Sequence, residues 1–128
     1  MRIIVASFIA FIALSFNAQA QRSVADHLMW DQLLQNHVNN AGEVDYEGFK
    51  ADPGLDRYLT VLSRAEPDES WSKQEKMAYW INAYNLYTIE LIVANYPVKS
   101  IKDIANGKPW DKKFIQLDGR NLSLNDIE

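Results

Sequence analysis

The sequence predicts an α+β fold that is mostly helical, with a long buried central helix at about residues 72–95 and a β-hairpin at about residues 113–124. Three observations predict this class. Apolar residues recur at helical spacing through much of the first half of the chain. Residues 77–89 contain no charged side chain. Asp118-Gly119 separates two β-prone runs and is a strong hairpin signal, because both positions of such a turn need positive φ.

Residues 1–20 have the three parts of a cleavable signal peptide of bacterial type. Arg2 gives a short positive start, residues 3–16 are apolar apart from two serines, and Ala18 and Ala20 form an A-x-A cleavage site. The apolar run is shorter than the roughly 20 residues of a membrane span. We therefore expect cleavage after Ala20, a periplasmic or secreted protein, and no membrane span after cleavage. A retained membrane anchor is the alternative.

Composition excludes several classes of function. The chain has 128 residues, a net charge of −4 and no cysteine. A mildly acidic domain lacks the basic surface that binds nucleic acid, so no nucleic-acid partner is expected. Without cysteine, these residues supply no disulfide, no lipid-modified cysteine, no thiol nucleophile and no thiolate metal ligand. The sequence also contains no glycine-rich phosphate loop.

Two helices are expected before the central one. The first covers residues 23–40, with Ser23 as its cap. An extended connector at residues 43–46 follows it. Asp52-Pro53 then starts the second helix, because aspartate is a capping residue and proline fits the first turn. The apolar stripes of the two helices are Trp30, Leu33, Leu34, His37 and Val38 in the first, and Leu55, Tyr58, Leu59 and Leu62 in the second.

The central helix is the best-defined element. Ser72 and Glu75 form a capping box at its start. Pro97 disfavours helical geometry at the residue before it, which puts the end of the helix near Asn95. A helix that is apolar around its whole circumference is packed on several sides. The uncharged stretch at residues 77–89 therefore predicts a helix that is buried all round.

Shorter elements are expected after the central helix. Residues 100–104 predict one or two helical turns, and the hairpin follows them. Residues 123–128 have the pattern of a cap and first turn of another helix, with Ser123 or Asn125 as the cap. A helix of that length is not stable alone. We therefore expect one domain at residues 21–128, truncated at its C-terminal side, with a frayed natural C-terminus as the alternative.

The motif at residues 79–85, Tyr-Trp-Ile-Asn-Ala-Tyr-Asn, resembles the most recognisable block of the domain of unknown function 547 (DUF547) family. The resemblance implies that the N-terminal half of that domain is in view, and that the pattern continues past Glu128 with histidine, arginine and a cysteine-containing segment. It implies no activity, and we expect no cofactor. Further pieces of the same pattern follow in order at residues 27–34, 44–49, 96–101 and 122–128.

Asn82 and Asn85 are the first candidates for binding residues. They lie three residues apart on one face of the central helix, in a stretch expected to be buried. An unpaired buried carboxamide costs about 1–3 kcal/mol, so both need partners. They either line a pocket and orient a polar ligand, or brace neighbouring loops through the backbone, which is the commoner role of buried amides. Trp80 and Tyr84 are also candidates, either as a sugar-stacking surface or as core residues.

No metal site is expected. His27 and Asp31 are four residues apart, but no further histidine shares their face, so a contact between imidazole and carboxylate is the more common arrangement. Glu43, Asp45 and Glu47 alternate, yet they lack the glycine and the ligand order of a calcium loop. The sequence therefore points to a side-chain contact between His27 and Asp31, and to no bound ion at either place.

Glu128 is the candidate for a catalytic residue, because a carboxylate beside a hairpin can belong to an acid–base pair. It can equally complement a helix dipole. Two functions follow. The first is an exported binding or interaction domain without catalysis of its own, with an envelope peptide or glycan as its ligand. The second is the N-terminal part of a hydrolase-like enzyme whose catalytic histidine or cysteine lies beyond Glu128.

Overall fold

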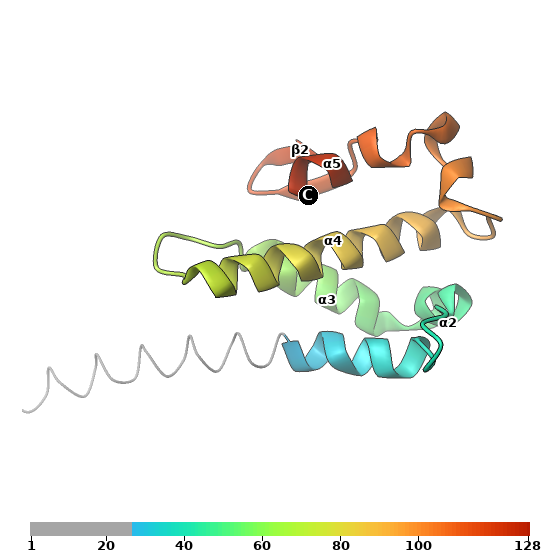
Figure 1. The fold of residues 1–128 in the computed structure, drawn as a ribbon, viewed down its shortest axis with the longest axis horizontal. Coiled ribbons are helices and arrows are strands. Elements are labelled where there is room, and N and C mark those ends of the chain that lie inside the picture. Colours follow the sequence, from blue (N-terminus) through green and yellow to red (C-terminus); the bar gives the residue numbers. More distant parts are fainter. Residues whose placement is uncertain (1–26) are drawn as a thin grey trace, which may run out of the picture.

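The computed structural model describes residues 27–128. The predicted signal peptide, its cleavage site and the predicted start of the first helix lie outside these residues. A helical segment at residues 27–37 comes first, and helices, 3-10 turns and one hairpin follow it (Figure 1). Their bounds in chain order are α2 Tyr46–Ala51, α3 Pro53–Arg64, α4 Lys73–Asn95, the 3-10 turns η1 Ile101–Asp103, η2 Ala105–Gly107 and η3 Pro109–Asp111, the strands β1 Ile115–Leu117 and β2 Arg120–Leu122, and α5 Leu124–Ile127.

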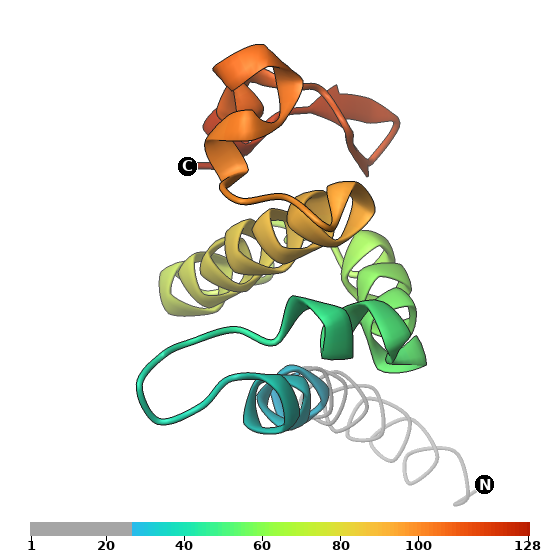
Figure 2. The same ribbon diagram turned by 90° about the vertical axis from the view of Figure 1, so that its right-hand side faces the viewer.

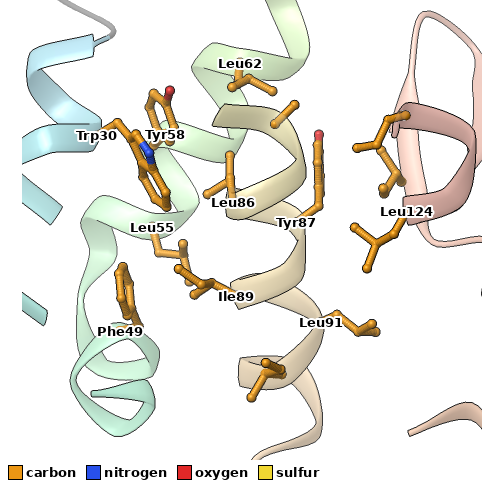
Figure 3. Packing of buried hydrophobic residues seen from close by; sticks show 14 of the residues in the cluster. Trp30, Phe49, Leu55, Tyr58, Leu62, Leu86, Tyr87, Ile89, Leu91 and Leu124 are labelled. Atoms are coloured by element: carbon orange, nitrogen blue, oxygen red, sulfur yellow. The ribbon is translucent and has the colours of Figure 1, made fainter. Parts of the chain in front are cut away.

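Helix α4 lies in the middle of the described structure. The 27–37 segment, α2 and α3 lie on one side of it, and the short elements from η1 to α5 lie on the other (Figures 1 and 2). Both sides bury apolar side chains against α4 (Figure 3). The predicted class, a mostly helical α+β fold with a central helix and a terminal hairpin, is thereby confirmed.

Large aromatic side chains hold the N-terminal side together. Trp30 stacks on Tyr58 with ring centroids 5.3 Å apart, and it lies 6.5 Å from the ring of Phe49 (Figure 3). The hydroxyl of Tyr79, from α4, donates a hydrogen bond to the carbonyl oxygen of Leu62 over 2.8 Å. Burial raises the pKa of Tyr79 well above its usual value, so this hydroxyl stays protonated. All five side chains are buried, which joins three helical elements and α4 into one core.

The first helix ends at His37, three residues earlier than predicted. Val38 instead forms an antiparallel bridge with Val44, and the N–H of Asp45 donates to the carbonyl of His37 over 2.8 Å. The Asp45 carboxylate then caps α2 by accepting from a backbone N–H three residues on, at 2.9 Å. This helix was not predicted, because Phe49 is its one buried residue and a single apolar position gives no periodicity.

Asp52 starts α3, as the sequence predicts. One carboxylate oxygen accepts from the N–H of Gly54 at 2.7 Å, and the other pairs with Nε2 of His37 at 2.8 Å. The same side chain therefore caps α3 and fastens it to the end of the 27–37 segment. The hydrogen bond to His37 is the main cause that lowers the pKa of Asp52 below its ordinary value of 3.8.

Helix α4 starts and ends as predicted, but one strip of it is open. Ser72 and Glu75 exchange the two capping-box hydrogen bonds, at 2.7 and 3.1 Å. Met77 and Ile81 are 54% and 55% exposed, and Asn85 is exposed as well. At about 100° per residue these three lie on one face of the helix, which neither side of the fold covers. The predicted burial around the whole circumference is therefore wrong on this face.

The predicted hairpin is confirmed on the C-terminal side. β1 and β2 pair antiparallel, with Ile115 opposite Leu122. Asp118 and Gly119 connect them with φ values of 48° and 69°, the positive values that the turn requires. The inward residues of β1 are fully buried, so the hairpin contributes apolar surface to the core.

The last helix, α5, begins at the predicted cap. Ser123 Oγ accepts from the N–H of Asp126 at 3.3 Å, and the Asp126 carboxylate accepts from the N–H of Ser123 at 2.6 Å. Asp126 also pairs with the ammonium of Lys113, which lowers the pKa of this carboxyl to about 2 together with the bonds to Ser123. Leu124 and Ile127 are buried, and Leu124 lies toward α4 (Figure 3). A helix of one turn is thus held by its cap and by tertiary packing.

Candidate functional site

The candidate binding residues of α4 point in three directions. Asn82 turns toward the 27–37 segment, and Asn85 lies on the open strip. Tyr84 turns toward the C-terminal side and lines a cleft there. The sequence placed Asn82 and Asn85 together on a buried face, but Asn82 is half-buried and Asn85 is exposed, so the two amides do not line one pocket.

Asn82 ties α4 to the first helical segment. Its amide nitrogen Nδ2 lies within hydrogen-bond distance of Nδ1 of His27, at 3.1 Å, across 55 positions of the sequence. The imidazole thus takes its partner from α4 instead of from Asp31, the partner that sequence spacing suggested. The bond therefore connects two helical elements of the described structure.

Trp80 packs within the fold. Its ring meets the ring of Tyr79 edge to face, with centroids 5.0 Å apart, and Tyr79 in turn meets Trp71 edge to face at 5.8 Å. Edge-to-face pairs at these distances are favourable arrangements of aromatic rings. The geometry therefore gives Trp80 a place in an aromatic cluster at the start of α4, away from the cleft that Tyr84 lines.

Tyr84 and Glu128, two residues singled out from the sequence for different reasons, line the same cleft. It lies between α4, the η2–η3 turns and α5, and its volume is about 370 Å³, which is near the lower end of the range of ligand pockets. Tyr84 and Trp110 are half-buried, and the polar lining residues are exposed. The lining consists of Tyr84, Gly107, Lys108, Trp110, Asp111, Asn125 and Glu128.

A strained turn and one side-chain bond shape this cleft. Ala105, Asn106 and Gly107 have φ values of 52°, 53° and 81°, a conformation that costs energy for residues with a Cβ. Asn125 then donates from Nδ2 to Oδ1 of Asp111 over 2.7 Å, which fastens η3 to α5. Backbone strain of this kind concentrates at functional sites. The short elements η2, η3 and α5 therefore form one wall of the cleft.

Two charged groups of the cleft have no partner within residues 27–128. Among the described residues, the side chains of Lys108 and Glu128 make no hydrogen bond or ion pair. Asp111 uses one carboxylate oxygen for Asn125, and within residues 27–128 no bond to its other oxygen is found. Donors and acceptors that face a hollow and are not used by the protein can bind a polar ligand directly.

A second hollow, of about 390 Å³, lies at residues 35–45 around the bridge between the first helix and α2. Its ionisable side chains already serve the fold. His37 pairs with Asp52, Asp45 caps α2, and Glu43 accepts a bond from Asn39 at 2.7 Å. This hollow therefore offers fewer open polar groups than the cleft beside Tyr84.

Two further properties limit the chemistry of residues 27–128. Within this range, no three His, Asp or Glu side chains lie close enough together to hold a metal ion. The helices of the same range are too short or too polar to cross a lipid bilayer.

Most residues of the cleft were not found from the sequence. Trp110, Lys108 and Asp111 are not among the candidates from the sequence, and Asn125 is one only as a helix cap. They lie on short irregular elements, and no periodic pattern marks them. The available signal was the Gly-Lys-Pro-Trp-Asp run at residues 107–111, in which glycine and proline punctuate the chain around a tryptophan.

Comparison with known proteins gives one match. Residues 69–128 match the family model described as Protein of unknown function, DUF547. The family predicted from the motif at residues 79–85 is thereby confirmed, although the match begins later than residue 27. No curated protein and no solved structure matches the chain. The matched range contains α4 and every residue that lines the cleft.

Proposed function

Residues 69–128 belong to the DUF547 family, and from this premise we propose that the protein is an exported binding domain whose cleft takes a glycan of the cell envelope. The family description names no activity, so the proposal depends on the cleft. The residues that line the cleft all lie within the segment that matches the family model, which supports the proposal. The signal-peptide pattern at residues 1–20 supports export.

The observation that carries the proposal is the combination of side chains in the cleft. Tyr84 and Trp110 offer aromatic surface that is already half-buried, and polar groups of Asp111, Asn125 and Glu128 surround it. A sugar ring has an apolar face of C–H groups and a rim of hydroxyls, so it needs an aromatic surface and hydrogen-bonding groups together. An envelope peptide is the other ligand to be tested, since its amides can use the same polar groups.

Binding of a neutral sugar tests this proposal directly. The probe is the trimer of N-acetylglucosamine, titrated into the full chain by isothermal calorimetry. Trp110→Ala should weaken binding by about tenfold, which corresponds to about 1.4 kcal/mol. Lys108→Ala should weaken it less, and the matched variant Lys99→Ala, at an exposed lysine outside the cleft, should leave it unchanged. Saturable binding that both lysine variants weaken equally, or no binding at all, contradicts the proposal.

A hydrolase-like enzyme is the second candidate, and one observation favours it. The carboxylate of Glu128, which has no partner in the described part of the chain, lies in the same cleft as Asp111, and glycoside hydrolysis commonly uses two carboxyl groups. If the protein is such an enzyme, the full chain should release reducing ends from the trimer, and Glu128→Gln should slow this by about a hundredfold or more. Binding without release of reducing ends, in both proteins, decides for the binding domain.

Export is tested on the protein made in its own cell type. N-terminal sequencing of the protein recovered outside the cytoplasm should begin at Gln21, because Ala18 and Ala20 are the small residues that signal peptidase reads. A chain that retains Met1 and stays in the membrane fraction supports the retained anchor instead. If the anchored domain also faced the cytoplasm, envelope glycans on the outer side could not be its ligands.

A further inference from the structure

We propose that the cleft beside Tyr84 selects amino sugars that carry a free ammonium group over their N-acetylated counterparts. This inference rests on the proposed function, because it specifies which glycan the same cleft prefers. It follows from the balance and the pairing of the charges that line the cleft, not from its size.

The charged lining of the cleft is predominantly acidic. Asp111 and Glu128 contribute carboxylates, and Lys108 contributes the one ammonium group among the lining residues. No arginine is present in the lining, and arginine is the residue that most often recognises carboxylate or phosphate by two parallel bonds. Anionic ligands would meet two like charges there. A cationic ligand is favoured by the net charge of the wall.

The charged side chains of the cleft do not neutralise one another. Lys108 forms no ion pair within the 27–128 range, so it does not neutralise either carboxylate. Glu128 has no partner in that range, and Asp111 accepts from a neutral amide, the side chain of Asn125. By contrast, the nearby Asp126 is already paired with Lys113. The two cleft carboxylates are therefore the ones that remain available for an incoming ammonium group.

The aromatic residues of the cleft favour the same ligand. Tyr84 and Trp110 present half-buried rings next to the carboxylates, and a cation held over an aromatic face is attracted to it, most strongly by tryptophan. A charged donor bonded to a carboxylate makes a shorter and stronger bond than a neutral amide does. Acetylation of the sugar nitrogen removes the positive charge and two of its donors, so it removes both interactions.

The test compares three probes of matched length on the full chain by calorimetry at low salt. They are the trimer of glucosamine, the trimer of N-acetylglucosamine and a lysine tripeptide. The glucosamine trimer should bind at least about tenfold more tightly than the acetylated trimer, and raising the ionic strength to about 0.5 M should reduce that difference, because salt screens exposed charges.

Two isosteric variants locate the effect. Asp111→Asn keeps an acceptor for Asn125 and removes the charge, and Glu128→Gln removes the charge at an exposed position. In each variant the glucosamine trimer should lose about threefold to tenfold more affinity than the acetylated trimer loses. Glu43→Gln, in the second hollow, is the matched control and should change neither. Circular dichroism verifies that every variant folds.

The outcomes separate this inference from the proposed function. Equal binding of the two trimers overturns the ammonium preference and leaves the glycan site standing. Binding of the lysine tripeptide as tight as that of the glucosamine trimer, with no binding of the acetylated trimer, overturns both, because charge alone would then explain recognition. A preference for glucosamine that Glu43→Gln reduces as much as Glu128→Gln does places the site elsewhere and overturns the inference.

Discussion

The two sides of α4 are built in different ways. On the N-terminal side, helical elements bury large aromatic side chains against one another, with Trp30 stacked on Tyr58 (Figure 3). On the C-terminal side, α4 is covered by 3-10 turns, a three-residue hairpin and a helix of one turn (Figure 1). Aliphatic residues such as Leu117 and Leu124 supply the fully buried contacts there.

Because of this difference, we expect most of the stability on the N-terminal side of α4, whereas the candidate site lies on the C-terminal side. Long helices bury continuous apolar stripes and leave few polar groups open, as the N-terminal side shows. Short elements depend on caps and side-chain bonds, such as those of Ser123 with Asp126 and of Asn125 with Asp111. They also expose polar residues at fixed positions, which is why binding residues concentrate on irregular segments held by a rigid scaffold. In this molecule α4 is that scaffold.

The largest effect is expected from the aromatic core. Phe49→Ala should lower the free energy of unfolding by about 3–5 kcal/mol, because Phe49 is fully buried and the cavity left behind would be lined by helices that cannot close on it. Urea denaturation followed by circular dichroism measures the change. A loss below about 1 kcal/mol would show that the N-terminal side is not the stable part of the fold.

A smaller and more local effect is expected on the other side of α4. Leu117→Ala should cost about 2–5 kcal/mol in the hairpin and α5 region. Because that region is built from short elements, hydrogen exchange of its amides should accelerate more than exchange in α3. Equal acceleration in both regions would mean that the two sides of α4 unfold as one unit and do not differ in local stability.

The link between the first helix and α3 should depend on pH. Asp52 has a pKa below its ordinary value of 3.8, chiefly because of the bond to His37, so the ionised form stabilises the fold. That stabilisation is fully present above about pH 5 and is lost as the pH falls through the lowered folded pKa. Asp52→Asn preserves a capping oxygen and should cost about 1–2 kcal/mol near neutral pH.

The control for Asp52→Asn is the pH dependence of the free energy of unfolding, measured for the parent and the variant. Stability curves of the parent and the variant should converge between about pH 5 and pH 2, because protonation removes the same charge from the parent. Curves that stay parallel over this range would show that the charge of Asp52 contributes nothing, and that its role is confined to capping α3.

The smallest effect is expected on the open strip of α4. Ile81→Ser should change the free energy of unfolding by no more than about 0.5 kcal/mol, since Ile81 is 55% exposed. Leu86→Ala, on the covered face of the same helix, should cost about 2–5 kcal/mol and serves as the comparison. A large loss at Ile81 would mean that the strip is covered in solution by something outside the described residues.

The sequence predicts the elements whose signals are local. The capping box of Ser72 and Glu75, and the turn at Asp118-Gly119, are complete within a few residues, and both are confirmed. Short α2 carries one buried residue and gives no such signal. The open strip of α4 could not be predicted, because an uncharged sequence does not reveal which faces the neighbouring elements will cover.

The candidate site was only partly predictable for a related reason. Tyr84 and Glu128 were singled out from a motif and from the chain's last turn, but nothing local indicated that they share a cleft. Partners such as Asn125 and Asp111, or Asn82 and His27, are brought together by tertiary packing across 14 and 55 positions. Spacing on one helix predicted a different partner for His27.

Chemical-shift mapping shows directly whether the C-terminal side of α4 carries the binding site. The full chain, labelled with ¹⁵N, is titrated with the trimers of N-acetylglucosamine and glucosamine. We expect saturable shifts at the indole of Trp110 and at the amides of residues 107, 108, 110, 111 and 125–128, with little change in α3 or at residues 35–45. Shifts confined to residues 35–45, or no saturable shift with either trimer, would contradict it.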